Sequence, residues 1–519
     1  MRRALWLSGA LVLAFWLSLL AGGRRVLFSE DIFLYFVPFL HAMKNSFWQG
    51  QWPLWTSLSS SGQSMWASLT GPLYPLTWLY AVVPVPYAYV IVTAVHTWVG
   101  LVGTALLLRH YRLGWVPALI GGTVYGFSGF LVSHSVHGNF VGTAAYLPLI
   151  LLLTHRTILE PGTRRVCWLA LAIGLAALQD QPQQLIIVLM VAAGYGLSVA
   201  VSHAVRLRER RRAWEGAGCA VLGVGLGFAV GAAQLIPSLE AVEVARLAAP
   251  SSAGLAFMDQ NRLTVFHLAT LVSPGLLGVP ADETYWGNGV FEETFAYAGV
   301  LPLLFAVTYL VWGPRNRAAT WWAAAGVMSL AISLGSKTPL LRLVAYVPVL
   351  DRLRCPGRVL CVLDLAIAVL CAHYIHAMGA RDDRQDSERN ERLARRSRIG
   401  ALVIGAFALF LATGAYTQRN RFVAAATKQG MNTAASYGLR LDADTAASVS
   451  MVASRTLRRM LSSALLTGVV LVVGSALHQA RGKCTWPLLQ EATWSVVGCW
   501  ALILVDLATV GRWECPTWP

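Results

Sequence analysis

Long apolar runs recur along the whole chain and are separated by polar segments. Several runs reach about 18 to 22 residues, the length at which an α-helix crosses the roughly 30 Å hydrocarbon core of a bilayer. The weak residue-by-residue alternation that marks a membrane β-barrel is absent from them. The pattern therefore predicts an all-α polytopic membrane protein with about 13 transmembrane helices.

Polar interruptions between the runs set the predicted span boundaries. They also leave two long loops, at about 23–71 and 237–293, which we expect to face outward from the cytoplasm. The spans with the clearest bounds cover about 4–22, 86–108, 115–132, 140–154, 216–236, 319–335, 359–378 and 490–510.

Positive charge divides the loops into two sets. The chain carries 41 Lys and Arg against 25 Asp and Glu, a net charge of +16. Short loops such as 206–212 and 313–317 are rich in Arg, and the positive-inside rule places them and the N-terminus in the cytoplasm. Because no soluble basic domain is present, we expect a lipid bilayer and not nucleic acid as the partner of this charge.

A run of mixed charge at 381–398 divides the chain. We expect it to be a solvated cytoplasmic linker. It separates a module at 1–380, with about 10 spans, from a C-terminal block at 399–519, with about three spans and an outward loop at 418–459.

Cysteine usage indicates neither a metal site nor a cofactor. The eight Cys are scattered, and no CxxC or Cys/His spacing is typical of zinc. We therefore expect no metal and no cofactor. Cys355 and Cys515 could both face outward, which leaves a disulfide between them as one option.

The topology places most of the unusual polar clusters on one face, and the first of them contains adjacent carboxylates. Glu30 and Asp31 would point about 100° apart on a helix, so they are poorly placed as a facing acid and base pair. One carboxylate could be aimed at a site. Alternatively, Ser29 and the two acids could cap the helix that starts near Ile32.

Aromatic and polar side chains follow in the same outward segments. Trp55 belongs to a Trp-rich loop that could form either an interfacial belt or a stacking surface for a substrate. His137 and Asn139 suit hydrogen bonding better than metal binding, because a third metal ligand is not evident. We count as candidate substrate contacts Tyr35, Trp55, His137, Asn139, Gln183, Gln184 and Glu293.

Amide side chains and arginines stand at two later boundaries of predicted spans, where such residues are unusual. Gln183 and Gln184 should enter the membrane, where amide side chains normally face a partner or a wet cavity. Arg352, Arg354 and Arg358 lie on the outer side, against the trend of the charge rule. They could pair with lipid head groups, or they could bind a phosphate.

The order of these motifs resembles the bacterial YfhO-like membrane protein family, a branch of the GT-C type glycosyltransferase superfamily. The resemblance covers about residues 25–380. The chain departs from the family pattern in two places. Thr56 stands where Asn is expected, and Asp-Gln-Pro-Gln at 180–183 stands where the family often has Gly-His-Pro-Gln. The matching pieces include EDIFLYFVPF, GQWPLWTSLSSSGQSMWA, GGTVYGFSGFLVSHSVHGNF, ALQDQPQQL, GAAQLIPSLEAVEVAR, YWGNGVFEETFAYAGV and LDRLRCPGRVL.

The resemblance implies a GT-C-like fold and a role for the first outward acid. In this superfamily that acid is the expected catalytic base or positions the acceptor. The matching residue here is Asp31, with Glu30 second. The implied donor is a polyprenyl-phosphate-linked sugar, and a cationic residue would stabilise the departing phosphate. The candidates for that residue are Arg358, Arg354 and Arg352.

The sequence thus predicts a glycosyltransferase of the bacterial inner membrane. It would move a sugar to a glycan, lipid or protein acceptor of the cell envelope on the extracytoplasmic face. One alternative is a transporter or flippase for a lipid-linked glycan, although no internal repeat is evident. Another is a non-catalytic scaffold in envelope assembly.

Overall fold

The computed structural model describes most of the chain. Cys515 lies outside the described residues, so the disulfide between Cys355 and Cys515 remains a prediction. The start of the predicted linker at 381–398 also lies outside them. The described residues are 2–20, 26–27, 29–57, 62–67, 69–206, 209–248, 254–347, 350–379, 384–436, 443–477, 494–514 and 517–518.

Helices dominate the described part of the chain, and the short strands pair only in twos. β1 pairs with β4 near the two ends of the chain, and β2 pairs with β3 inside the first polar loop. The strands are β1 (Val26–Leu27), β2 (Trp55–Thr56), β3 (Gln63–Ser64) and β4 (Thr517–Trp518). The helices up to residue 248 are α1 (Arg2–Leu20), η1 (Ile32–Phe36), α2 (Val37–Trp48), η2 (Met65–Ala67), η3 (Pro75–Trp78), α3 (Leu79–Val82), α4 (Val85–His110), α5 (Trp115–Gly126), α6 (Gly129–Ser133), η4 (His134–Val136), α7 (Gly138–Ala145), α8 (Leu147–Leu159), α9 (Thr163–Ala177), α10 (Pro182–Arg206) and α11 (Arg210–Ala248).

Short helices carry the second polar loop, and long ones form the C-terminal block. The remaining helices are α12 (Leu255–Met258), α13 (Val265–Thr270), η5 (Pro274–Leu277), η6 (Pro280–Asp282), α14 (Phe291–Thr294), α15 (Val300–Trp312), α16 (Arg317–Ser333), η7 (Gly335–Lys337), α17 (Pro339–Val344), η8 (Leu350–Arg352), η9 (Pro356–Val359), α18 (Leu360–Gly379), α19 (Arg384–Thr417), α20 (Arg419–Ser436), α21 (Ala443–Leu477) and α22 (Trp494–Glu514).

The all-α multi-pass architecture is confirmed, but the number of spans is only partly accounted for. Within the described residues, eight helices are long and apolar enough to cross a membrane, or nine if the bent pair at 115–136 is one span. Other predicted spans fall on shorter helices such as α1, α9, α15 and α16. A total of 13 therefore remains a prediction.

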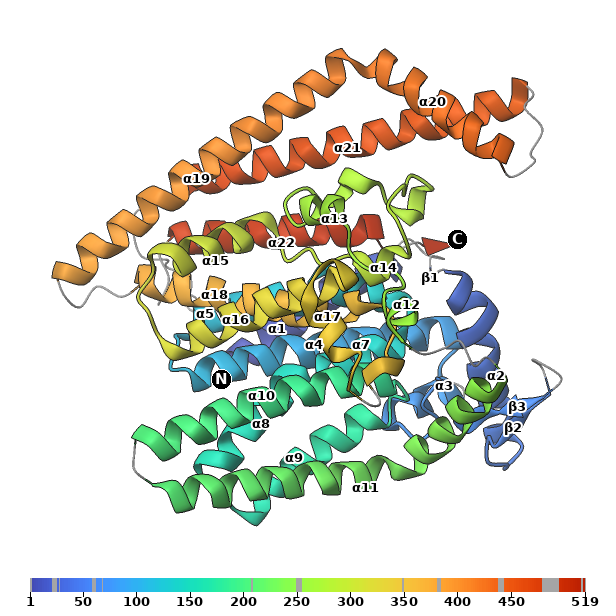
Figure 1. Cartoon of the computed structure of the whole chain (residues 1–519), viewed down its shortest axis with the longest axis vertical. Coiled ribbons are helices and arrows are strands. Elements are labelled where there is room, and N and C mark those ends of the chain that lie inside the picture. Colours follow the sequence, from blue (N-terminus) through green and yellow to red (C-terminus); the bar gives the residue numbers. More distant parts are fainter. Residues whose placement is uncertain are drawn as a thin grey trace.

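The helices pack as a layered bundle (Figure 1). α19 and α21 lie side by side along one edge, and α9 and α11 lie side by side along the opposite edge. Between these edges α4, α5, α15, α16 and α18 pack against one another. Because α18 is buried on nearly every side, its long apolar run can face protein around its whole circumference.

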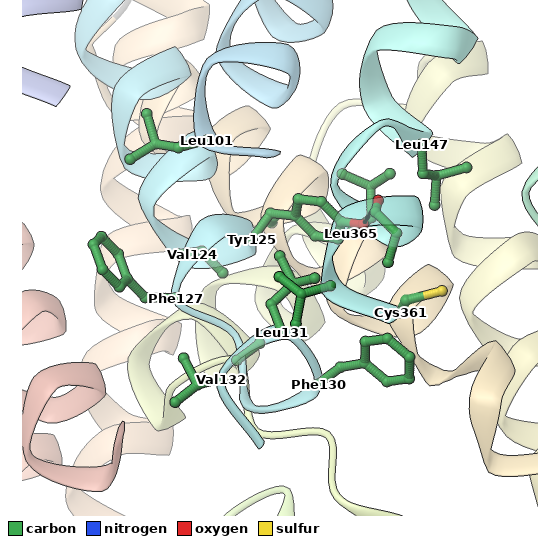
Figure 2. Close-up of a cluster of buried hydrophobic side chains, with 14 of the residues drawn as sticks. Leu101, Val124, Tyr125, Phe127, Phe130, Leu131, Val132, Leu147, Cys361 and Leu365 are labelled. Carbon is green, nitrogen blue, oxygen red and sulfur yellow. Dashed lines mark hydrogen bonds between the residues drawn. The ribbon is translucent and has the colours of Figure 1, made fainter. Parts of the chain in front are cut away.

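A buried cluster fills the bundle where α5 ends and α6 begins (Figure 2). Tyr125 and Phe130 pack there with Leu365 of α18, and all three side chains are fully buried. The chain bends by 40° at this break, which leaves backbone groups without helical partners. Asp364 of α18 satisfies one of them, because its Oδ2 accepts the Phe130 N–H at 3.2 Å. The intramembrane carboxylate thus supports a broken helix.

The C-terminal block holds the second polar loop in place. Arg459 of α21 donates from Nε to Asp282 at 2.8 Å, and Ser463 Oγ accepts the Gly275 N–H at 2.8 Å. Asp506 of α22 accepts the Tyr297 hydroxyl and caps the start of α15 at Val300. These contacts bracket α14, which carries two carboxylates into the cavity described next.

Candidate functional site

One cavity of about 820 Å³ collects side chains from segments far apart in the sequence. Its walls come from the start of η1, the η4–α7 turn, α14 and the turn before α18. Of the residues predicted from the sequence, it is lined by Glu30, Asp31, Tyr35, His137, Asn139, Glu293, Arg354 and Arg358.

The first wall begins at a capped helix start. Ser29 Oγ accepts the Ile32 N–H at 3.1 Å, so the capping interpretation describes Ser29. The side chain of Asp31 caps nothing and is 61% exposed. Next along the wall, burial raises the pKa of Tyr35 to about 12, so its hydroxyl stays neutral at physiological pH. Capping by Ser29 and presentation of Asp31 to the cavity are therefore compatible.

Asp31 and His137 form a close pair. His137 Nε2 lies 2.6 Å from Asp31 Oδ2, and the imidazole is mostly buried while the carboxylate is largely open. The hydrogen bond from His137 lowers the pKa of Asp31, the charge of His137 acts in the same direction, and partial burial opposes both. His137 thus fixes the orientation of a carboxylate that is ionised at neutral pH.

Arg358 and Glu293 form a second, buried pair in the lining of the cavity. Arg358 Nε lies 2.9 Å from both Glu293 oxygens, and Nη1 donates to Gln183 Oε1 at 2.8 Å. The guanidinium also stacks over Phe140, with Cζ 4.6 Å from the ring centroid. Burial acts to raise the pKa of Glu293, but the charge and hydrogen bonds of Arg358 outweigh it, so the pKa is lowered. Much of the charge of Arg358 is therefore already balanced.

Arg354 is the exposed cation of this wall. Its backbone carbonyl accepts a hydrogen bond from the amide of Gln183, which thereby links Arg354 to Arg358. The Arg354 side chain is exposed and lines the cavity. Compared with Arg358, Arg354 is freer to meet an anionic ligand.

Two further residues join the site without having been among the candidates. Glu292 lines the cavity beside Glu293, and burial raises the pKa of its carboxyl. His134 Nε2 lies 4.0 Å from Glu293 Oε2, behind His137. The SHSVHGNF stretch holds His134 as well as the candidate His137. Sequence alone offered no signal to separate Glu292 from Glu293.

The remaining candidates lie away from the cavity lining. Gln184 is fully buried behind it, where its Nε2 contacts Cys361 Sγ at 3.2 Å. Trp55 is exposed on β2, and Arg352 is exposed at the end of η8. The structure therefore does not bring Trp55 or Arg352 to this cavity.

The departure from the family pattern at Asp180 anchors the first polar loop. Asp180 is fully buried, and its Oδ2 accepts the Leu69 N–H at 2.8 Å, while Oδ1 accepts the Ser238 hydroxyl. Burial raises the pKa of Asp180 to about 6, against the opposing effect of these hydrogen bonds. Leu69 and Gln181 both line the cavity, so this anchor shapes its rim.

The chemistry of the lining is mixed. The lining combines the carboxylates of Glu30, Asp31 and Glu292 with the guanidinium groups of Arg354 and Arg358. Within the described residues, no three His, Cys, Asp or Glu side chains are arranged to hold a metal ion. A cavity that holds both an open carboxylate and guanidinium groups is suited to accepting a proton from one part of a ligand while binding an anionic part.

Residues 4–237 match the family model described as bacterial membrane protein YfhO. This match confirms the YfhO-like resemblance over those residues, which include Asp31, His137 and Gln183. The match ends before Glu293 and Arg358, so that wall of the cavity lies beyond it.

Similarity to other characterised proteins is remote. No protein of curated function matches the sequence significantly. Two crystal structures of ArnT from Cupriavidus metallidurans are similar to the whole chain, one bound to undecaprenyl phosphate and one in the apo state. They are 14% identical, with TM-scores of 0.45 and 0.44, over 98% of this chain and 77% of the ArnT chain.

Proposed function

We propose that this protein is a membrane glycosyltransferase that moves a sugar from a polyprenyl-phosphate donor to an acceptor hydroxyl of the cell envelope. The observation that carries the proposal is the placement of the Asp31–His137 pair in one cavity with Arg354 and Arg358. A glycosyl transfer from a phosphate needs a proton acceptor and a cationic partner for the leaving group within one site.

Asp31 is the proton acceptor in this proposal. The acceptor hydroxyl oxygen attacks the anomeric carbon, and the bond between that carbon and the phosphate oxygen breaks. The hydroxyl proton goes to the Asp31 carboxylate, which His137 holds in place through the 2.6 Å contact. In this proposal the mostly buried His137 serves as a positioning residue for Asp31.

The departing polyprenyl phosphate takes up the electron pair, and Arg354 and Arg358 stabilise the developing charge. Because Glu293 already balances much of the charge on Arg358, Arg354 makes the larger contribution. Arg358 instead keeps the wall rigid and presents its remaining N–H groups to the cavity.

Asn139 is the best-placed residue for binding the sugar. Its Oδ1 accepts the Phe140 N–H at 3.0 Å, which fixes the orientation of the amide. Its Nδ2 is buried and has no hydrogen-bond partner in the described part of the chain. A sugar hydroxyl would satisfy this donor, which is otherwise costly to leave unpaired.

The test is to incubate the purified full-length protein with a panel of polyprenyl-phosphate sugars and envelope acceptors, and to measure released polyprenyl phosphate. We expect release by the wild type and a loss of about 10²- to 10⁴-fold in Asp31→Asn, the range typical of a missing general base. Trp55→Ala is the matched control, because Trp55 is exposed and lies outside the cavity lining.

The same samples separate the competing functions. A transporter reconstituted in liposomes would move a labelled lipid-linked sugar across the bilayer without releasing polyprenyl phosphate. A scaffold would do neither and would be indifferent to Asp31→Asn. Either result overturns the proposal. Protease protection of loop 29–57 in sealed inverted vesicles, where the extracytoplasmic face is enclosed, tests the proposed sidedness.

A further inference from the structure

A second cavity lies near the opposite end of α18. It has a volume of about 550 Å³ and is lined by His373, which stands thirteen residues after Leu360, the first residue of α18. Thirteen helical residues rise about 20 Å, so this cavity is well separated from the one beside Arg358. The transfer chemistry proposed above makes no use of it.

His373 is built into the wall of this second cavity. Its ring stacks against Tyr111 and Tyr309, with centroid separations of 6.3 and 5.6 Å. Asn316 Nδ2 lies 3.4 Å from His373 Nδ1 and also donates to the Tyr309 hydroxyl at 2.8 Å. Because an amide nitrogen can only donate, Nδ1 is the acceptor, and the ring proton belongs on Nε2.

The Nε2 atom of His373 is the informative one. The side chain is 6% exposed, and Nε2 has no hydrogen-bond partner within the described residues. A buried N–H donor without an acceptor is destabilising. Since the residue lines the cavity, the missing acceptor is best supplied by a ligand placed there.

The charged side chains of the lining are guanidinium groups. Arg112, Arg317, Arg389 and His376 line the cavity, and none of the described residues that line it is a carboxylate. The N-terminus of α16, a helix of 17 residues, also opens here at Asn316 and Arg317. The positive end of that helix dipole favours an anion in the same place as the arginines.

We propose that this second cavity binds a phosphate group, carried either by an anionic lipid head group or by a soluble phosphate. Separate guanidinium groups, a histidine N–H and a helix N-terminus together suit an anion with several oxygens. A neighbouring hollow of about 880 Å³ shares Asn316 and Arg317 and is lined by Trp321 and Ala324, which leaves room for the remainder of a larger ligand.

Binding is measured on the purified full-length protein in a neutral detergent. One arm uses radiolabelled phosphatidylglycerol in mixed micelles, with phosphatidylcholine as the competitor. The other arm uses equilibrium dialysis with radiolabelled inorganic phosphate. Saturable binding in the first arm alone assigns a lipid head group. Saturable binding in the second arm assigns a site that also accepts soluble phosphate.

Three variants test the location of the site. Arg112 has a φ of 64°, so Arg112→Gly removes the guanidinium and relieves backbone strain together. Arg317→Gln removes a second charge, and His373→Phe keeps a ring between the two tyrosines while deleting the N–H donor. We expect each variant to weaken binding about tenfold, the range for one charge-assisted hydrogen bond.

Arg164→Gln is the matched control. Arg164 is exposed in the first turn of α9 and does not line either hollow. It should bind like the wild type. The proposal is overturned if neither probe binds, if Arg112→Gly and Arg317→Gln bind normally, or if Arg164→Gln weakens binding as much as they do. Arg112→Gly keeps the test decisive if His373→Phe fails to fold.

Discussion

The guanidinium of Arg358 is held by the carboxylate of Glu293, with Nε 2.9 Å from each carboxylate oxygen. Both side chains are buried, and Glu293 reaches the pair from a loop that the C-terminal helices hold in place. Arg358, which the sequence indicated as a phosphate-binding cation, therefore also connects two segments that are far apart in the chain.

Glu293→Gln is expected to destabilise the protein by about 3 to 5 kcal/mol, because it leaves the buried Arg358 without a counter-charge. Thermal unfolding of the purified protein measures this loss. The double variant Glu293→Leu with Arg358→Met removes both charges and should recover much of the stability. An unfolding midpoint for Glu293→Gln equal to that of the wild type would contradict the assignment.

His137→Asn should move the acid limb of the pH profile of kcat/KM to higher pH. The hydrogen bond from His137 lowers the pKa of Asp31, so removing the imidazole lets that pKa rise toward its ordinary value. In the wild type the Asp31–His137 pair stabilises the folded protein above the pKa of Asp31 in the unfolded chain, about 3.9. This stabilisation is lost as the pH falls through the lower pKa of Asp31 in the folded protein.

Two measurements of the pKa of Asp31 check this expectation. A ¹³C NMR titration of Asp31 reports its pKa directly, and the kinetic profile reports it through activity. Glu30→Gln is the control, because Glu30 lines the same cavity and has no described contact with His137. An acid limb that does not move in His137→Asn, or that moves equally in Glu30→Gln, would rule out His137 as the positioning residue.

Much of the fold could be predicted from the sequence because span length and apolar character are local properties. The predicted spans at 86–108 and 359–378 correspond closely to α4 and to the span Pro356–Met378. The predicted span at 115–132 corresponds to a bent pair, and one backbone N–H at the break is satisfied by Asp364, which lies far along the chain. No local pattern reveals such a partner.

The site was predictable to the extent that topology places loops at one end of the bundle. Asp31, His137 and Arg358 were each singled out by a polar cluster at a span boundary, and the structure brings them to one cavity. The pairing of Arg358 with Glu293 depends on how the long second loop folds, so it could not be read from spacing. Trp55 was also a candidate, but it lies outside the cavity lining. Its aromatic side chain suits a membrane interface as well as a substrate-binding wall, so the sequence could not separate the two roles.

Asp180→Asn should make stability less dependent on pH. The pKa of Asp180 is raised to about 6, so the folded state binds this proton more tightly than the unfolded state. Stability is therefore highest below the unfolded pKa, falls as the pH rises from about 4 to about 6, and is lower by up to about 3 kcal/mol above that range.

Asparagine fits the position of Asp180. Asp180 has a φ of 58°, a conformation that Asn tolerates well. The amide oxygen can accept from Leu69. The amide nitrogen can donate to Ser238, whose hydroxyl can then donate to the Gln234 carbonyl, 2.9 Å away, in place of Asp180. Unfolding midpoints between pH 4 and 8 check the expectation. Equal slopes for wild type and Asp180→Asn would contradict it, and Asp351→Asn serves as a carboxylate control outside this anchor.

Gly357→Ala tests how closely the turn before α18 approaches α14. A Cβ at Gly357 would overlap the backbone oxygen of Glu293, so the two segments would have to separate. We expect a loss of about 1 to 3 kcal/mol, typical of overpacking, and a lower initial rate of polyprenyl-phosphate release because Arg358 loses its alignment. Gly218→Ala is the matched control, since nothing lies within 4 Å of the added methyl on α11. That variant should be neutral or slightly more stable, because alanine favours a helix interior over glycine. If both variants unfold at the wild-type temperature, the close contact between Gly357 and Glu293 is absent in the membrane-embedded protein, and the rigid wall assigned to Arg358 must be abandoned.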